Sequence, residues 1–444
     1  MTTVGRGRSR ALRISVAVVA IFAVAISGML GYVYLHLNSN IKTFSEVGLS
    51  PSRPPSATAA PGSTTGPPIN LLLIGSDSRS GENLGLGGGA AVDGARSDTT
   101  ILIHISGDRK HAIGVSIPRD SLVDIPACYA NGAWMPAQTH VMFNSAFAEG
   151  NLPGGNPTCT QNTVESMTGI RIDHTIVADF VGFANMSTLI GGVTVCVPTV
   201  DNTYLEHAYG VTLTPGMQNL TGQAAVEYVR AREGFGDNSD IGRMKRQQAF
   251  LSALMKKMLD AGTLSNPITI YQLADAATSS LTVDSYLDSV GALVSLATQL
   301  KSVSLSNIEF VTTPWQYDGA RVDLIQPDTD ILWSLLREDR TLEGQDVSGA
   351  SPSSDASQNP SASPTSSPSA KANVAGAPSA AAERLTVERL GAGLGLSSSL
   401  GPTAGPSASA GASASSAPTP IPSGITNNIR RADSNACSDL SYGN

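Results

Sequence analysis

Aspartate and arginine are concentrated in five short motifs in the middle of the sequence, four of which contain both residue types. A guanidinium group matches phosphate oxygens through paired hydrogen bonds, and a carboxylate binds a hard cation such as magnesium. A lone Asp–Arg pair is usually a surface ion pair of small energy, but five motifs near the predicted ends of strands and helices favour a phosphate site. The motifs are Gly75-Ser76-Asp77-Ser78-Arg79, Arg96-Ser97-Asp98-Thr99, Pro118-Arg119-Asp120, Val229-Arg230-Ala231-Arg232 and Asp240-Ile241-Gly242-Arg243.

Two of these motifs place side chains on a common face. Arg230 and Arg232 are two residues apart in a predicted strand, 227–232, and alternate residues of a strand project from one face. Their like charges repel, so the pair favours an anion between them. Arg243 and Gln247 are four residues apart and share a helix face, near a helix N-terminus whose free N–H groups attract phosphate.

Asp77 and Asp98 form the candidate metal site, because each lies beside the end of a predicted strand. Two carboxylates suit magnesium, which keeps several waters and takes its other ligands from substrate phosphates. Ser78 and Ser97 lack the context of a nucleophile elbow, so a serine hydrolase triad is not expected.

The motifs lie within a predicted alternation of strands and helices. This order, with some gaps short enough for hairpins, predicts an α/β fold with a mixed sheet flanked by helices, preceded by one transmembrane helix and followed by a disordered tail. The predicted strands are 70–76, 100–106, 111–117, 174–180, 193–198, 227–232 and 308–313. The predicted helices are 144–149, 160–168, 181–190, 221–227, 241–260 and 283–300.

An apolar run without any charge, Ile14 to Leu35, precedes this domain. About 20 residues at a rise of about 1.5 Å span a bilayer, so the run is long enough to cross. A cleaved signal peptide is the alternative, but its apolar region would be shorter and would end in a small-residue cleavage site. Arginines before the run predict a single-pass protein of the cell membrane, with a cytoplasmic N-terminus and an extracytoplasmic domain.

Composition divides the chain into five segments. A tail rich in Ser, Ala, Pro and Gly cannot bury enough apolar surface to offset the entropy of ordering, so disorder is predicted there. The net charge of −8 gives no general attraction to nucleic acid, and no such partner is expected. The segments are a cytoplasmic basic tail at 1–13, a transmembrane helix at 14–36, a Pro/Ser-rich linker at 37–67, an extracytoplasmic catalytic domain at 68–340 and a Ser/Ala/Pro-rich disordered tail at 341–444.

The four cysteines follow the apolar run, on the side of the membrane where disulfides persist. Cys128 and Cys159 have loop-like flanks and predict a Cys128–Cys159 disulfide. Cys196 lies in an apolar, strand-like run and is expected to be buried as a small hydrophobic residue. No pair has the spacing of a zinc site.

Taken in order, the motifs resemble those of the LytR-CpsA-Psr family of cell-wall glycopolymer phosphotransferases. The resemblance covers about 70–260, with weaker support to about 340, and it is specific because many motifs agree in order. Besides the five Asp/Arg motifs and the preceding run Asn70-Leu71-Leu72-Leu73-Ile74, it includes Phe143-Asn144-Ser145-Ala146-Phe147, Thr168-Gly169-Ile170-Arg171-Ile172-Asp173 and Gly191-Gly192-Val193.

The resemblance implies a role for each motif residue. Asp77 and Asp98 would hold Mg²⁺ at a pyrophosphate. Apart from the resemblance, we expect a carboxylate, either Asp98 or Asp120, to accept the proton of the acceptor hydroxyl. The implied phosphate-binding residues are Arg79, Arg119, Arg230, Arg232, Arg243 and Gln247, with Arg96 and Asp240 supporting them. The implied catalytic residues are Asp77, Asp98, Arg119, Asp120, Arg230 and Arg232.

The implied fold encloses an apolar tunnel for a polyprenyl chain. The implied reaction transfers a phosphoglycan from a polyprenyl-pyrophosphate carrier to a peptidoglycan hydroxyl, which attaches a secondary polymer to the wall. Two alternatives stay open: a hydrolase of the same lipid-linked glycan, and a non-catalytic glycan-binding or regulatory membrane anchor. Retention of both aspartates and of every arginine in the motifs argues against the second alternative.

Overall fold

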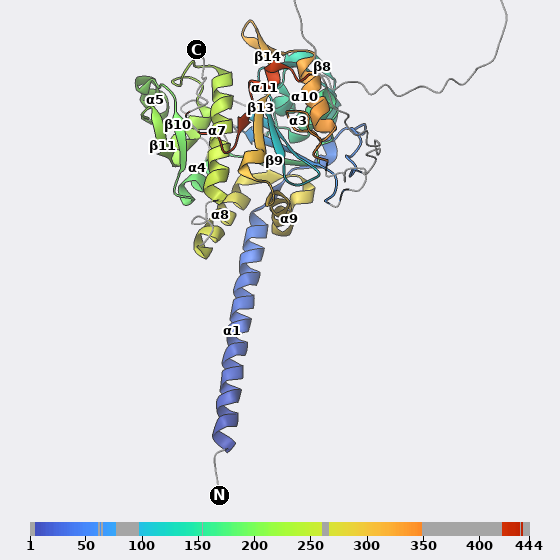
Figure 1. The fold of residues 1–444 in the computed structure, drawn as a ribbon. Coiled ribbons are helices and arrows are strands. Elements are labelled where there is room, and N and C mark those ends of the chain that lie inside the picture. The colour runs from blue at the N-terminus through green and yellow to red at the C-terminus, as the bar shows by residue number, and fades with distance from the viewer. Residues whose placement is uncertain are drawn as a thin grey trace, which may run out of the picture. The chain divides into compact units, whose positions relative to one another are not determined.

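A mixed β-sheet forms the centre of the molecule (Figure 1). The computed structural model describes residues 5–60, 63, 65–76, 97–152, 154–259, 266–348, 420–435 and 437. In spatial order, its eight strands within these ranges are β1 (Lys42–Thr43), β12 (Leu281–Val283), β9 (His174–Ala178), β2 (Ile69–Ser76), β3 (Ser97–Ile105), β4 (Ala112–Ser116), β13 (Ile308–Thr312) and β16 (Arg430–Arg431). β3 is antiparallel to its two neighbours, β2 and β4, whereas β9 is parallel to β2 and β13 is parallel to β4.

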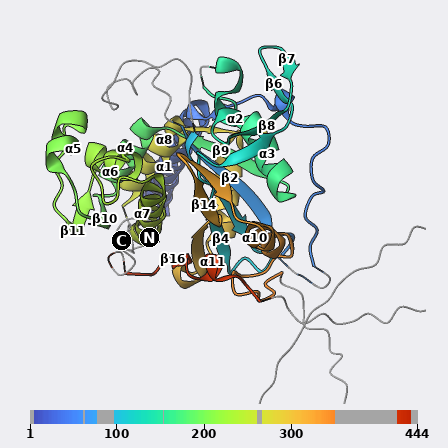
Figure 2. The same cartoon turned by 90° about the horizontal axis from the view of Figure 1, so that it is seen from above.

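Helices cover both faces of this sheet (Figure 2). Leu72, Ile74 and Leu102 face one side and are fully buried against helices α3 (Pro157–Thr168) and α10 (Asp328–Arg337). Leu73 and Ile101 face the other side, and alternation along β2 and β3 therefore makes both faces apolar. The remaining helices beyond the first are α2 (Ser145–Ala148), α4 (Phe180–Leu189), α5 (Asn202–Tyr209), α6 (Gly222–Arg230), α7 (Asp240–Leu259), α8 (Pro267–Ser280), α9 (Val290–Leu300) and α11 (Ser423–Thr426).

A smaller lobe packs beside the sheet on the α7 side. Its hairpin of β10 (Val193–Val197) and β11 (Gly216–Leu220) shares an apolar core with α4, α5, α6 and α7. Tyr228, Phe235 and Phe250 fill that core. The other strand pairs are β5 (Leu122–Ile125) with β8 (Gln138–Met142), β6 (Cys128–Ala130) with β7 (Ala133–Met135) and β14 (Trp315–Asp318) with β15 (Arg321–Leu324).

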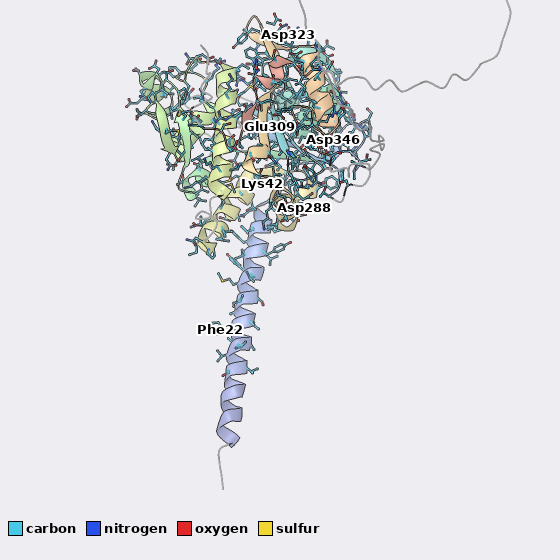
Figure 3. All side chains as sticks on the ribbon, in the orientation of Figure 1. Phe22, Lys42, Asp288, Glu309, Asp323 and Asp346 are labelled. Atoms are coloured by element: carbon cyan, nitrogen blue, oxygen red, sulfur yellow. A yellow bond between two sulfur atoms is a disulfide. The ribbon has the colours of Figure 1, made fainter. Side chains whose placement is uncertain are left out.

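The first helix, α1 (Gly5–Asn40), contains a stretch long and apolar enough to cross a membrane, Ser15–Asn40. Most of its large apolar side chains are exposed, as Figure 3 shows for Phe22, whereas Leu37 near its end is buried. The last turn is bonded to the domain: Asn40 Nδ2 donates to Asp275 Oδ1 of α8 at 2.8 Å, and Asn38 Oδ1 accepts from Val290 N of α9 at 3.2 Å.

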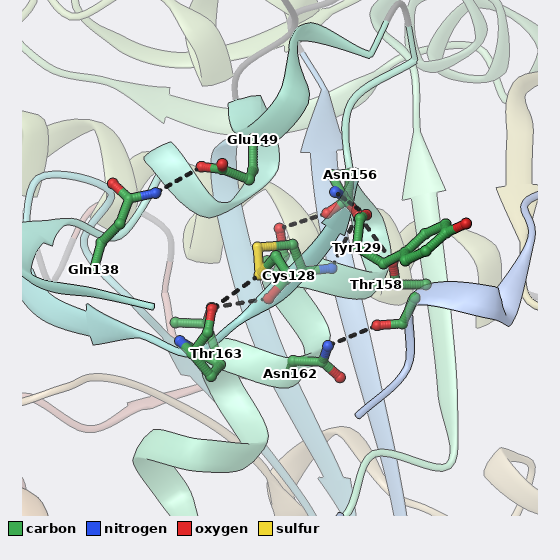
Figure 4. The surroundings of a disulfide bond; sticks show 12 residues. Cys128, Tyr129, Gln138, Glu149, Asn156, Thr158, Asn162 and Thr163 are labelled. Carbon is green, nitrogen blue, oxygen red and sulfur yellow. Dashed lines mark hydrogen bonds between the residues drawn. A yellow bond between two sulfur atoms is a disulfide. The ribbon is translucent and has the colours of Figure 1, made fainter. Parts of the chain in front are cut away.

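Two disulfides join distant parts of the fold. Cys128 and Cys159 form the predicted bridge, beside the Asn156 side chain that caps α3 by accepting from Cys159 N at 3.1 Å (Figure 4). Cys196 forms the second bridge, with Cys437. Cys196 is buried as expected, but the expectation that it only fills space as a small hydrophobic residue was wrong, because its disulfide partner lies 241 residues away and leaves no local signal in the sequence.

Two predicted elements differ from the structure. Residues 227–232 are not a strand, since α6 continues to Arg230 before the chain becomes extended at Ala231. The helix predicted at 283–300 begins only at Val290, after the short strand β12. The alternation of small and charged residues in 229–232 favours a strand locally, but contacts from α7 stabilise the helical end of α6.

The segments on either side of the domain are more structured than their composition predicts. Residues 37–40, placed in the linker, belong to α1. Arg53 of the linker is fixed by Glu165, with Nε 2.9 Å from Oε2 and Nη2 2.6 Å from Oε1. Within the predicted tail, β16 pairs antiparallel with β13, so residues 420–431 depart from the predicted disorder. This strand's pairing supplies backbone hydrogen bonds that composition alone does not predict.

Candidate functional site

Charged side chains from β3, the β4 end and α7 meet in one cluster. Arg119 Nη1 donates to Asp98 Oδ1, and Arg119 Nε lies 3.1 Å from Asp240 Oδ1. Arg243 Nη2 lies 2.5 Å from the same Asp240 oxygen and donates to the Asp98 carbonyl at 3.0 Å. Asp98, Arg119, Asp240 and Arg243, here called the charged cluster, thus alternate two carboxylates with two guanidinium groups.

Burial makes this cluster different from a surface ion-pair network. Arg243 is 2% exposed and Asp98 is 8% exposed. Charges removed from water interact more strongly with one another, and a buried charge left without a partner strongly destabilises the folded protein. The four groups therefore hold one another in place, and loss of a member leaves a buried charge uncompensated.

The two carboxylates of the cluster have opposite pKa shifts. Burial alone would raise the pKa of Asp98, but the positive charges of Arg243 and Arg119 outweigh it and lower the pKa below its usual value. Burial raises the pKa of Asp240, and Arg243 and Arg119 offset this only in part. Asp98 is therefore held as an anion, whereas Asp240 is the more easily protonated carboxyl.

Asp120 lies at the edge of this cluster. Arg119 Nε is 3.6 Å from Asp120 Oδ2, and Arg321 Nη1 of β15 is 3.9 Å from Asp120 Oδ1. Arg321 was not predicted from the sequence, where it lies outside the five motifs. Its half-exposed ion pair contributes little stability.

An apolar pocket of about 100 Å³ adjoins the cluster. Its polar lining comes from Asp98, Thr99, Asp179, Arg230 and Gln247. Its apolar walls come from the sheet and from α4 and α7, and they include Leu73, Ile101, Phe183, Phe250 and Leu251. A concave apolar site with a few convergent polar groups is the usual form of a ligand pocket.

The structure separates the two arginines of the fourth motif. Arg230 ends α6 and lines the pocket, whereas Arg232 follows the helix, is 44% exposed and lies 3.3 Å from Glu233. Because 227–232 is not a strand, the reason for expecting one shared face no longer holds. Gln247 is buried in the pocket wall and donates through Nε2 to the Val229 carbonyl at 2.9 Å.

Two residues near the pocket were missed by sequence reasoning. Arg246 is buried in α7 and donates to the carbonyls of Tyr228, at 2.9 Å, and Ala231. It lies three residues after Arg243, a spacing that could have indicated a second inward-facing arginine. Glu227 is fully buried in α6, and burial raises its pKa to about 7 despite the opposing charge of Arg230.

Three predicted site residues, Asp77, Arg79 and Arg96, lie outside the described residues. Their described neighbours are next to each other, since Ser76 pairs with Ser97 across β2 and β3. The donor chemistry of Asp98 fits a hard cation, because its carboxylate is ionised and lies beside the pocket.

Comparison with known proteins identifies relatives of most of the chain. A sequence profile described as the LytR_cpsA_psr family matches residues 33–337. The chain is 31% identical over 265 residues to the cell wall biosynthesis protein LcpA of Corynebacterium glutamicum, which covers 55% of this chain and 49% of LcpA. It is 32% identical over 276 residues to the probable cell wall biosynthesis protein LcpB of that organism, covering 60% and 61%.

A relative with an enzymatic name comes from Bacillus subtilis. The chain is 29% identical over 273 residues to the polyisoprenyl-teichoic acid–peptidoglycan teichoic acid transferase TagT, covering 61% of this chain and 75% of TagT. The match to the two corynebacterial relatives spans about half to three fifths of their length.

Proposed function

Because the chain belongs to the LytR_cpsA_psr family, we propose that it transfers a phosphoglycan from a polyprenyl-pyrophosphate carrier to a hydroxyl of peptidoglycan. The observation that carries this proposal is the apolar pocket with Asp98, Arg230 and Gln247 in its lining. An apolar chain and a doubly charged pyrophosphate need these two environments side by side. The name of TagT, a transferase that acts on polyisoprenyl-linked teichoic acid and peptidoglycan, supports the same substrate classes.

The apolar pocket and the charged cluster bind different parts of the substrate. The polyprenyl chain packs against Phe183, Phe250 and Leu251, where its burial is favourable by about 25 cal/mol per Å². The pyrophosphate binds at Arg230 and beside Arg119. Guanidinium groups in a partly buried site stabilise phosphate charge more strongly than they would in water.

The reaction joins the acceptor oxygen to the sugar-side phosphorus and breaks the bond from that phosphorus to the bridging oxygen. Polyprenyl phosphate leaves with the electron pair of that bond, and Arg230 and Arg119 stabilise its charge. Asp120 accepts the hydroxyl proton, because its side chain is 18% exposed whereas Asp98 is paired with Arg119 and Arg243. Positioning and charge stabilisation are the main demands of phosphoryl transfer.

Magnesium, when bound, would be held by Asp98 together with Asp77 and would neutralise part of the pyrophosphate charge. The pairing of Ser76 with Ser97 supports this assignment, since those residues directly precede Asp77 and Asp98. Asp98→Asn, which keeps the side chain's size, should weaken binding of manganese as a spectroscopic probe. Unchanged manganese binding in this variant would remove Asp98 from the metal site.

We place the domain outside the cell, with α1 crossing the membrane. Arginines before the apolar stretch favour a cytoplasmic N-terminus. Protease added to intact, wall-stripped cells should therefore digest the region after about residue 40. Protection of that whole region would contradict this orientation.

The transfer itself is tested with a lipid-pyrophosphate glycan and magnesium, in the presence and absence of peptidoglycan. Acceptor-dependent attachment of glycan supports the proposal. Release of glycan at the same rate without acceptor would instead indicate a hydrolase. Binding without turnover would indicate a non-catalytic anchor, and Arg230→Ala serves as the control for activity at the pocket.

A further inference from the structure

Two helices beside the membrane-spanning helix carry almost no charge. Within α8 the one charged residue is Asp275, and α9 contains none. Surface helices of water-soluble domains normally carry charged residues on their outer faces. The composition of α8 and α9 is therefore unusual for helices that face water.

Large apolar side chains of these helices are nevertheless exposed. Ile268 of α8 is 66% exposed and Val294 of α9 is 58% exposed, with Tyr286 between the two helices at 68%. Ile270 and Leu300 are also exposed. An apolar surface of this kind indicates contact with a partner or with a membrane.

The contacts of α1 indicate which of these two covers the surface. About 20 residues of helix cross the hydrocarbon core, so a span that starts at Ser15 ends near Tyr34. Tyr32 and Tyr34 are exposed there, as is typical of aromatic side chains at the membrane interface. The next turn of α1, from His36 to Asn40, therefore lies at the level of the lipid headgroups.

That same turn lies beside α8 and α9 (Figure 1) and is hydrogen-bonded to both helices. His36 Nε2 lies 2.9 Å from Asp275 Oδ1, and the ring of His36 lies 6.4 Å from that of Tyr271. Asp275 is thus occupied by α1, and α8 is held at the height of the headgroups. On α9, the N-terminal Val290 bonds to Asn38 and is held at the same height.

We propose that α8 and α9 lie in the interfacial layer of the bilayer that α1 crosses, with Ile268, Ile270 and Val294 in contact with lipid. The inference rests on the proposed role of α1 as a membrane anchor. Interfacial helices bury an apolar face to a depth of about 5–10 Å at the headgroup boundary. The domain then has a fixed face toward the membrane instead of hanging from a flexible linker.

This placement gives the lipid chain a route to the pocket. Phe183 and Phe250 line the pocket, and Leu254 and Leu273 continue the same apolar cluster from α7 to α8. A polyprenyl chain that leaves the bilayer at α8 therefore meets apolar side chains along its path. Its exposure to water, which would be unfavourable in proportion to area, is reduced.

Spin labels on the full-length protein in lipid nanodiscs test the proposal. All four native cysteines are in disulfides, so one introduced cysteine carries the label. Ile268→Cys and Val294→Cys are the test sites, Leu30→Cys reports α1, and Met217→Cys, exposed on β11 of the smaller lobe, reports a face of the domain without such an anchor. Each site is exposed, so the label should not disturb packing.

Collisions with oxygen, which is enriched in lipid, are compared with collisions with a water-soluble nickel complex. Labels at Ile268→Cys and Val294→Cys should behave like Leu30→Cys and favour oxygen, whereas Met217→Cys should favour nickel. A Leu30→Cys label that favours nickel would refute the anchor itself. Lipid contact at Leu30→Cys with nickel access at both test sites would overturn this inference alone. Shielding of both test sites from both reagents would indicate a protein partner, such as a second copy, and would also overturn it.

Discussion

The carboxylate of Asp98 is in contact with two arginines that approach it from different elements, Arg119 after β4 and Arg243 on α7. Their charges lower the pKa of Asp98 against the effect of its burial. Asp240 holds the same two arginines from the other side and has a raised pKa. At this scale, the site is a set of charges that hold one another in position, and the proposed pyrophosphate would change their net balance.

Arg230 and Arg232 should now differ in their effect on transfer. Arg230→Ala removes a guanidinium from the pocket and should lower kcat/KM by on the order of 10²-fold, the usual loss for one preorganised donor. Arg230→Lys should recover little, because an ammonium group cannot form paired hydrogen bonds. Arg232→Ala, at an exposed position beside Glu233, is the matched control and should lose much less.

Both rates are measured on preparations with known thermal midpoints, so that loss of folded protein is not mistaken for loss of activity. Equal losses in the two alanine variants would contradict the separation of Arg230 from Arg232.

Glu227 should make folding stability depend on pH. Its folded pKa is raised to about 7 from a usual value of 4.5, so its stabilising contribution is complete below about pH 4.5 and is lost as pH rises through about 7. The loss amounts to about 3 kcal/mol at most, since one pKa unit corresponds to about 1.4 kcal/mol. Glu227→Gln removes the titration and keeps the side chain's size.

The measurement compares the free energy of unfolding of both proteins at about pH 5 and about pH 7.5. The wild type should lose stability relative to Glu227→Gln across this interval. Parallel pH dependence in the two proteins would show that the carboxyl does not titrate there.

At the scale of the elements, polar side chains of α7 contact the C-terminal end of α6. The last carbonyls of a helix have no partner within the helix. Arg246 supplies partners to Tyr228 and Ala231, and Gln247 supplies one to Val229. These contacts place Arg230, which lies between the bonded carbonyls, at the pocket.

Arg246→Met should therefore misplace the end of α6. Losing two hydrogen bonds from a charged donor should reduce the free energy of unfolding by on the order of 3 kcal/mol, and transfer per folded molecule should fall with it. Lys256→Met, at an exposed position of the same helix, controls for loss of a charge from α7. Full activity per folded molecule in Arg246→Met would show that the α6 end is held by other contacts.

The same contacts explain what the sequence could and could not predict. Strands such as 70–76 and 308–313 were predicted within one or two residues, because apolar runs bounded by turn residues are local signals. The end of α6 was mispredicted because Arg246 stabilises it from α7, which is a tertiary effect. Strand β16 has two residues and a partner more than a hundred positions away, so pattern alone could not reveal it.

For the site, the motifs predicted part of the charged cluster, but not the separation of Arg230 from Arg232 and not how the cluster residues divide their roles. Asp98, Arg119, Asp240 and Arg243 do lie together, as motifs at element ends suggested. Burial separates the pKa values of Asp98 and Asp240, and burial follows from the complete fold. Glu227 could not be singled out, because a glutamate in a helix is usually exposed.

Across the whole molecule, α7 connects the charged cluster to the proposed membrane face. From Gln247 to Leu259 the helix rises about 18 Å, at about 1.5 Å per residue. The linker is fixed at Arg53 by Glu165, and α1 is fixed to α8 by His36 and Asn40. Folded structure therefore sets the distance between the proposed membrane face and the proposed pyrophosphate site.

The bond between Cys196 and Cys437 closes the backbone into a ring that contains residues 349–419. A protease that cuts once within this ring opens it without releasing a fragment, since the C-terminal piece stays covalently attached. Nicked protein should therefore run as one band on a denaturing gel without reductant and as two bands with it. Nicked Cys437→Ser should give two bands in both lanes, and two bands from nicked wild type without reductant would contradict the bridge. A chain cut in this way keeps β16, and with it the edge of the sheet that β16 completes.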